Sequence, residues 1–70
     1  MTFLQACVLA AEKAKAKGVV FYVYEAPTLW YITSSYNPTM RWLFRAYPGG
    51  RKEITETGAK LAEAEGVDVR

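Results

Sequence analysis

The sequence contains no histidine and only one cysteine, Cys7, and these shortages exclude several kinds of site. Without histidine, the most frequent general base of enzymes is missing. One cysteine cannot form a disulfide within the chain, and without histidine it cannot complete a typical zinc site. We therefore expect no catalytic residue, no metal site and no cofactor. The unpaired cysteine also favours a reducing compartment, so we expect a cytoplasmic protein.

Long apolar runs are missing as well. No run approaches the roughly 20 residues that cross a bilayer, so we expect no membrane partner. The apolar start, residues 3–11, is interrupted by Gln5 and has no basic residue before it, which makes it a poor signal peptide. The 70 residues form one small domain, 1–70, whose stability is marginal unless aromatic packing, self-association or a partner supports it.

Residues 2–17 have the pattern of a helix. Thr2 and Gln5 stand at capping-box spacing, and Gly18 is a natural stop. The apolar positions that recur at helical spacing are Leu4, Cys7, Val8, Ala11 and Ala14. This places Cys7 on the buried stripe, where we expect a structural residue and not a nucleophile.

Residues 19–24 and 29–35 are rich in β-branched and aromatic side chains, which predicts two strands joined by a turn around Pro27. Alternation separates two faces of this hairpin. The apolar face, which we expect to form the core, consists of Val19, Phe21, Val23, Trp30 and Ile32. The opposite face consists of Val20, Tyr22, Tyr24, Leu29, Tyr31 and Thr33.

The next segment, residues 40–47, fits two patterns. Met40, Leu43, Phe44 and Tyr47 would share one face of a helix. As a strand, which the aromatic density favours, Met40, Trp42, Phe44 and Ala46 would point inward, and Arg41, Leu43 and Arg45 outward.

The C-terminal third predicts three short elements. Residues 51–55 suit a short strand, and Thr55 or Thr57 could cap a helix that ends at Gly66. Residues 67–70 suit a tail or a brief strand. The fold class is therefore α+β: an N-terminal helix packed on a three- to four-stranded antiparallel sheet, in the order α-β-β-β-α, with a short C-terminal helix.

Nine of the ten aromatic residues lie between Phe21 and Tyr47. A small domain cannot bury both faces of so aromatic a segment, so one face should meet water or a partner. We expect Tyr22, Tyr24 and Tyr31, the tyrosine face, to bind a partner, because tyrosine is enriched at binding hot spots. The simpler alternative is that these tyrosines are cross-strand partners that only stabilise the sheet.

Four cations are the second candidate for a site: Arg41, Arg45, Arg51 and Lys52. Basic residues interleaved with aromatic rings suit an anion or single-stranded nucleic acid. The simpler alternative is that charges on an exposed strand prevent unwanted pairing.

The predicted order of elements is similar to that of double-stranded RNA-binding domains. Those domains carry a basic cluster at the start of the second helix, whereas residues 52–60 here are mixed and acid-leaning. The resemblance therefore implies the order of elements and not the activity.

We expect a non-enzymatic protein-interaction module that uses the tyrosine face to bind a partner protein or a second copy as a homodimer. Small phage-encoded inhibitors of host proteins are similar in size and composition, which suggests an inhibitor or regulator of that type. The alternative is a nucleic-acid-binding regulator that uses the four cations.

Overall fold

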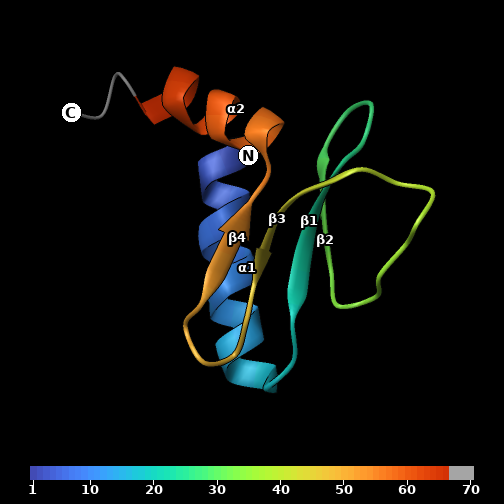
Figure 1. Ribbon diagram of the computed structural model, residues 1–70, viewed down its shortest axis with the longest axis vertical. Helices are drawn as coiled ribbons and strands as arrows, with labels where there is room; N and C mark the ends of the chain where they lie inside the picture. Colours follow the sequence, from blue (N-terminus) through green and yellow to red (C-terminus); the bar gives the residue numbers. More distant parts are fainter. Residues whose placement is uncertain (67–70) are drawn as a thin grey trace.

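A computed structural model describes residues 1–66, and within them the chain forms two helices and one four-stranded sheet (Figure 1). The elements follow in the order α1 (Phe3–Lys17), β1 (Phe21–Glu25), β2 (Trp30–Thr33), β3 (Trp42–Ala46), β4 (Lys52–Ile54) and α2 (Glu56–Gly66). The predicted α+β class is confirmed, with a fourth strand that makes the order α-β-β-β-β-α. The ambiguous segment around Phe44 is a strand. The element predicted for residues 67–70 lies outside the described residues.

Both ends of α1 are fixed by local hydrogen bonds. The hydroxyl oxygen of Thr2 accepts from the amide of Gln5 at 3.1 Å, and the Gln5 side chain accepts from the amide of Thr2 at 2.8 Å. At the other end, Gly18 adopts the left-handed conformation with φ of 71°, and its amide donates to Ala14 O at 2.8 Å. The capping box and the glycine stop are confirmed.

The buried stripe of α1 differs from the predicted stripe. The fully buried residues of the helix are Phe3, Ala6, Ala10 and Ala14, whereas Cys7 and Ala11 are only partly buried against the core. Leu4 is partly exposed, and Val8 is 59% exposed. The observed buried stripe therefore lies at a different angle around the axis of α1 from the predicted stripe. Three alanines of the true stripe allow the helix to lie close against the sheet, because their side chains end at Cβ.

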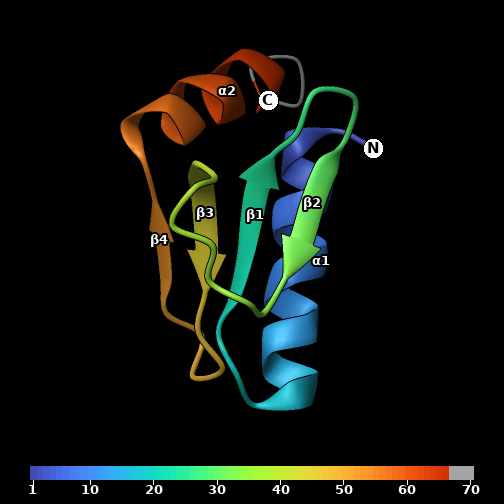
Figure 2. The ribbon, with the colours of Figure 1, turned by 90° about the vertical axis from the view of Figure 1, so that its right-hand side faces the viewer.

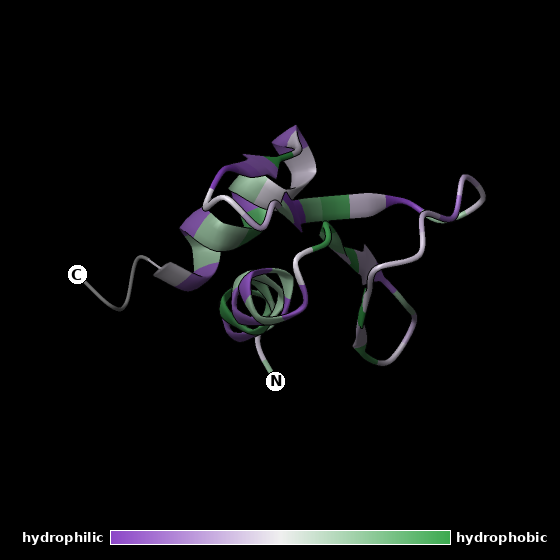
Figure 3. Ribbon diagram, turned by 90° about the horizontal axis from the view of Figure 1, so that it is seen from below, coloured by the Kyte–Doolittle hydropathy of each residue, from purple (hydrophilic) through white to green (hydrophobic). Residues whose placement is uncertain are grey.

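The sheet has the strand order β2-β1-β3-β4, and every neighbouring pair is antiparallel (Figure 2). Helix α1 packs against one face, here called the inner face, and Figure 3 looks along α1 and shows it lying to one side of the strands. Phe21 and Val23 are buried on this face, with Trp30 and Ile32 packed against the same core. The other face, here called the outer face, is not covered by either described helix. The predicted faces of the β1–β2 hairpin are confirmed for Phe21, Val23, Trp30 and Ile32. Val19, which was predicted to join the core, precedes β1 and is 46% exposed.

A β-bulge at Leu43 changes the faces of β3. Val23 pairs with Phe44, but the next residue, Tyr24, pairs with Trp42, so that Leu43 has no partner on β1. The bulge places Phe44 and Ala46 in the core, as predicted, but turns Trp42 to the outer face beside Tyr22. Leu43 is completely buried. The predicted inward position of Trp42 and outward position of Leu43 are therefore wrong.

The connection between β2 and β3 is a crossover. Both strands are antiparallel to β1, which lies between them, so they run parallel to each other. The loop of residues 34–41 must return along the length of the sheet, and it passes over the outer face in front of β1 (Figure 2). This loop, called the crossover loop, therefore covers part of the outer face.

Helix α2 closes the end of the sheet and contacts α1 and β3. The hydroxyl oxygen of Thr55 accepts a hydrogen bond from the amide of Gly58 at 3.2 Å, so Thr55 caps the helix. Of the two predicted caps, Thr55 and Thr57, the first is therefore confirmed. Near the other end of α2, the Glu65 carboxylate accepts from the amides of Phe3 and Leu4 at 3.0 and 2.9 Å. An anion at the positive end of α1 is favourable, so this contact joins the two helices.

Neither described helix is long and apolar enough to cross a membrane.

Candidate functional site

Three aromatic side chains are in contact on the outer face, and this group is here called the aromatic surface: Tyr22, Tyr36 and Trp42. Tyr22 is at its centre, with ring centroids 5.7 Å from Tyr36 and 6.4 Å from Trp42. Tyr36 is 59% exposed, and Tyr31, which lies on the same face at the β2 edge opposite Tyr24, is 50% exposed. The contacts of Tyr22 with Tyr36 and Trp42 are tilted and edge-on, which is a favourable geometry for ring pairs. The aromatic surface is therefore well packed from within and open on its outer side.

Tyr24 lies beneath this surface. Its ring stacks on Tyr22 at 5.8 Å, and it is completely buried. Its hydroxyl accepts from the amide of Asn37 at 2.6 Å and donates to Ser35 O at 3.2 Å. Tyr24 thus attaches the crossover loop to the sheet. This burial removes Tyr24 from the exposed tyrosine face that the sequence predicted, while Tyr22 and Tyr31 remain on it.

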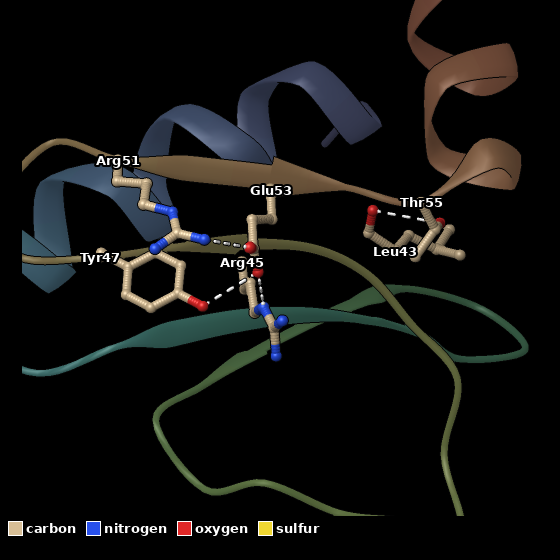
Figure 4. Close-up of polar contacts among 6 residues, drawn as sticks. All are labelled: Leu43, Arg45, Tyr47, Arg51, Glu53 and Thr55. Atoms are coloured by element: carbon tan, nitrogen blue, oxygen red, sulfur yellow. Dashed lines mark hydrogen bonds and ion pairs between the residues drawn. The ribbon is translucent and has the colours of Figure 1, made fainter.

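Next to the aromatic surface, one carboxylate of β4 accepts hydrogen bonds from three side chains, one on β3 and two in the connection between β3 and β4 (Figure 4). The Glu53 carboxylate accepts from Arg45 Nε, from the Tyr47 hydroxyl at 2.9 Å and from Arg51 Nη2 at 2.7 Å. Arg45 also stacks over the Trp42 ring, with the guanidinium carbon 4.4 Å from the centroid. Glu53, Arg45, Tyr47 and Arg51 are here called the Glu53 cluster.

The electrostatics of the Glu53 cluster follow from these bonds. The hydrogen bond from Tyr47, and then that from Arg45, lowers the pKa of the Glu53 carboxyl below its ordinary value. The same bond raises the pKa of the Tyr47 phenol, because an ionised phenol would lose its donor and meet a carboxylate. At neutral pH the cluster therefore holds two guanidinium groups and one carboxylate, so one of its two positive charges is compensated internally.

The four predicted cations do not form one patch. Arg45 and Arg51 meet at Glu53, on the same side of the sheet as the aromatic surface. Arg41 is exposed and precedes β3, where its carbonyl accepts from the Glu25 amide at 3.3 Å. Lys52 lies beside α1, where it lines a shallow groove with Lys15 and Gly49.

Sequence reasoning did not assign Glu53, Trp42 or Tyr36 to the leading site. A signal for Glu53 was present in the sequence. Arg45 and Glu53 flank the turn 48–50 at equal spacing from its centre, and a hairpin around that turn pairs them directly. Trp42 could not be assigned, because its side of the strand depends on the bulge.

Cys7 has the character of a structural residue. It is partly buried and packs against the core cluster. Burial, and to a smaller degree the nearby Glu65 carboxylate, raises the pKa of the Cys7 thiol to about 12. The thiol is therefore protonated at neutral pH, and a protonated thiol is a poor nucleophile. Within residues 1–66 no group of three or more metal-binding side chains could hold a metal ion.

A second apolar surface lies along α1, on the opposite side of the molecule. A groove of about 650 Å³ runs along the helix between Met1 and Glu12, and its wall includes Leu4 and the exposed Val8.

Comparison of the chain with protein-family models, with curated proteins and with solved structures finds no match.

Proposed function

We propose that this protein is a non-enzymatic interaction module that binds a partner protein through the aromatic surface. The observation that supports this most is the ring cluster around Tyr22, with Tyr31 and Tyr36 at least half exposed on the sheet face that no described helix covers. Tyrosine and tryptophan are enriched in the buried centres of protein interfaces, and their rings supply large contact areas with few rotatable bonds.

The rigidity of the surface adds to this argument. Tyr22 is held between three other rings, and the loop that carries Tyr36 is attached to the sheet through Tyr24 and Asn37. A surface whose side chains are already ordered loses little conformational entropy on binding. The module would act by occupying a surface of its partner, as a regulator or an inhibitor does.

The charge beside the aromatic surface favours a protein over a polyanion. Glu53 accepts hydrogen bonds from both nearby arginines, Arg45 and Arg51, so two guanidinium groups are already paired. Polyanion binding depends on cations that can release the counterions of phosphates. A mixed rim of charges around an apolar centre is the usual anatomy of a protein interface.

Site-specific photo-crosslinking tests the proposal. Benzoylphenylalanine is placed at position 36 in one variant and at position 8 in another. Tyr36 and Val8 are each 59% exposed but lie on opposite sides of the molecule, which makes them a matched pair. In extracts of the source cells, we expect a discrete crosslinked protein from position 36 and none from position 8.

Competition shows whether the crosslink reports the aromatic surface. Unlabelled wild-type protein should abolish the crosslink, and the double variant Tyr36→Ala/Trp42→Ala should fail to do so. The comparison variant Leu4→Ala/Val8→Ala should compete like the wild type. Equal crosslinking from both positions, or full competition by the Tyr36→Ala/Trp42→Ala variant in its folded state, would contradict the proposal.

A second candidate function is binding to single-stranded nucleic acid. The observation in its favour is that Arg45 and Arg51 share the outer face with the aromatic rings, Arg45 stacking on Trp42 and Arg51 lying 5.0 Å from the Tyr47 centroid. Stacked rings beside guanidinium groups can hold bases and phosphates. Oligonucleotide binding measured against salt tests it. Affinity that falls steeply with salt supports nucleic acid, and absence of binding at low salt removes it.

A further inference from the structure

The strand β2 lies at one edge of the sheet. It pairs with β1 on one side, and none of the described strands pairs with its other side. In Figure 2, β2 is the outermost strand, with α1 behind it and no element beside it in the plane of the sheet. An edge strand presents backbone donors and acceptors that another strand can use.

The register shows which backbone groups of β2 point outward. The amide of Ala26 donates to Leu29 O at 3.2 Å, so this pair is a hydrogen-bonded pair of the hairpin. Hydrogen-bonded pairs alternate along an antiparallel ladder, so Tyr31 and Thr33 also direct their backbone groups to β1. The amides and carbonyls of Trp30 and Ile32 therefore point away from the sheet.

The two edges of the sheet are protected unequally. At the far edge, β4 has only three residues, and two of them are the charged Lys52 and Glu53. Short length and charge both discourage pairing with another chain. β2 has four residues, Trp30–Thr33, and contains no charge and no proline. Its residue Tyr31 and the adjoining Leu29 are 50% and 57% exposed. The β2 edge is thus open to a further strand.

The sequence of β2 fits a second copy of itself. Trp30 and Ile32, the two residues with outward backbone groups, are placed symmetrically about Tyr31. If two β2 strands run antiparallel with Tyr31 on a twofold axis, Trp30 of each copy lies opposite Ile32 of the other. All outward amides and carbonyls of both strands are then paired. On the outer face Leu29 lies opposite Thr33 of the other copy, and no like charges meet.

We propose that this chain forms a twofold dimer in which β2 pairs antiparallel with β2 of a second copy, making one continuous sheet from the two four-stranded sheets. The two Tyr31 residues face each other as a non-hydrogen-bonded pair, with Cα atoms about 4.5 Å apart. Trp30 packs beside Ile32 of the other copy on the inner face. The dimer does not depend on what the aromatic surface binds.

Charge swaps at the axis test this arrangement. By sedimentation or light scattering, the wild type should have twice the mass of the chain. Tyr31→Lys and Tyr31→Glu should each be monomeric, because like charges then meet across the axis. An equimolar mixture of the two variants should regain the dimer mass. The comparison variant Tyr36→Lys, at an exposed tyrosine away from the edge, should remain dimeric.

A disulfide provides a second, covalent readout. Tyr31→Cys places two thiols opposite each other within the Cα separation that disulfides accept. Mild oxidation should give nearly complete covalent dimer for Tyr31→Cys, and little for Tyr36→Cys, which is exposed but distant from the axis. The native Cys7 does not interfere, because it is partly buried and packed against the core.

The outcomes separate this proposal from the proposed function. A wild-type protein that stays monomeric at the highest attainable concentration overturns the dimer, as does a Tyr31→Lys variant that is still dimeric. Rapid dimer formation by Tyr31→Cys together with loss of the dimer in Tyr31→Lys supports it. Neither result changes the photo-crosslinking expected from position 36, which tests the aromatic surface alone.

Discussion

The phenol oxygen of Tyr24 accepts a hydrogen bond from the amide of Asn37 at 2.6 Å, which joins the centre of the sheet to the crossover loop. The same hydroxyl donates to Ser35 O, so a single side chain satisfies two backbone groups of the loop. Between these two residues lies Tyr36, the most exposed ring of the aromatic surface. The position of Tyr36 therefore depends on a residue that is itself completely buried.

Tyr24→Phe should destabilise the protein and loosen the crossover loop. The substitution keeps the buried ring but removes both hydrogen bonds, leaving the Asn37 amide without its partner. We expect the free energy of unfolding to fall by about 1–3 kcal/mol, the range for leaving a buried polar group unsatisfied. Urea denaturation measures the change, and hydrogen exchange at Asn37 should accelerate.

The control for this substitution is Tyr31→Phe, which removes a hydroxyl from a half-exposed ring. It should change the free energy of unfolding by less than about 0.5 kcal/mol. Equal effects of the two substitutions would show that the Tyr24 hydroxyl does not hold the loop.

Gly58→Ala should destabilise the protein although alanine is the better helix former. A Cβ at position 58 would lie 2.5 Å from Leu43 O and 2.9 Å from a side-chain carbon of Ile54. Because Leu43 O is a backbone atom that also accepts from the Thr55 amide, α2 would have to move away from β3. We expect a loss of about 1–3 kcal/mol in the free energy of unfolding, typical of overpacking.

The matched control is Gly66→Ala, in the same helix. A Cβ there would meet only Leu4 Cδ1, at the ordinary contact distance of 3.8 Å. The free energy of unfolding should stay within about 0.5 kcal/mol of the wild type. If Gly58→Ala proves as neutral as Gly66→Ala, α2 does not approach β3 as closely as described.

Lowering the pH should reduce the stability of the wild type more than that of the variant Glu53→Gln, which has no carboxylate at this position. The hydrogen bond from Tyr47 and then that from Arg45 lower the pKa of Glu53 in the folded chain. Its contribution to stability is therefore complete above the ordinary value of 4.5 and is lost as the pH falls through the lower folded pKa. The difference in melting temperature between wild type and Glu53→Gln should shrink below pH 4.5.

Tyr47→Phe removes the largest cause of that pKa shift and provides the control. In this background the effect of Glu53→Gln on the melting temperature should be smaller at neutral pH and vary less with acid. In the chain that keeps Tyr47, an effect of Glu53→Gln that does not change between neutral and acidic pH would contradict the role given to the cluster.

Cys7 should react slowly with thiol reagents. Its pKa is raised from 9.0 to about 12, chiefly by burial, so the thiolate fraction at mildly alkaline pH is about a thousandfold lower than in an unfolded chain. Alkylation should be slow in the native protein and ordinary in guanidinium chloride. Val8→Cys in a Cys7→Ala background puts the thiol one position along, at a site that is 59% exposed in the wild type, and should react quickly. Similar native rates for both thiols would contradict this account.

The local parts of the fold could be predicted from the sequence. The Thr2–Gln5 box and the Gly18 stop depend on neighbours a few residues away, and both were predicted correctly. The buried stripe of α1 was not, since small side chains occur on both possible stripes. Ala6 and Ala10 differ little from Cys7 and Ala11 in size, and only Phe3, which contacts Trp30, distinguishes the true stripe.

The candidate site was less predictable because its parts are placed by the tertiary structure. The bulge at Leu43 arises where β3 meets both β1 and the Thr55 cap of α2, and no sequence alternation shows it. The burial of Tyr24 arises because β2 and β3 lie on opposite sides of β1, which sends the connecting loop over the sheet. Strand order is not contained in the pattern of a single strand.

The short, charged strand β4 also limits how large an assembly can become. Pairing through β2 is isologous, since it uses the same edge of both chains and leaves only the two β4 edges at the ends of the joined sheet. Lys52 and Glu53 make those ends poor templates for another strand. Growth would stop at two chains, and the aromatic strand that favours association would not give rise to a fibre.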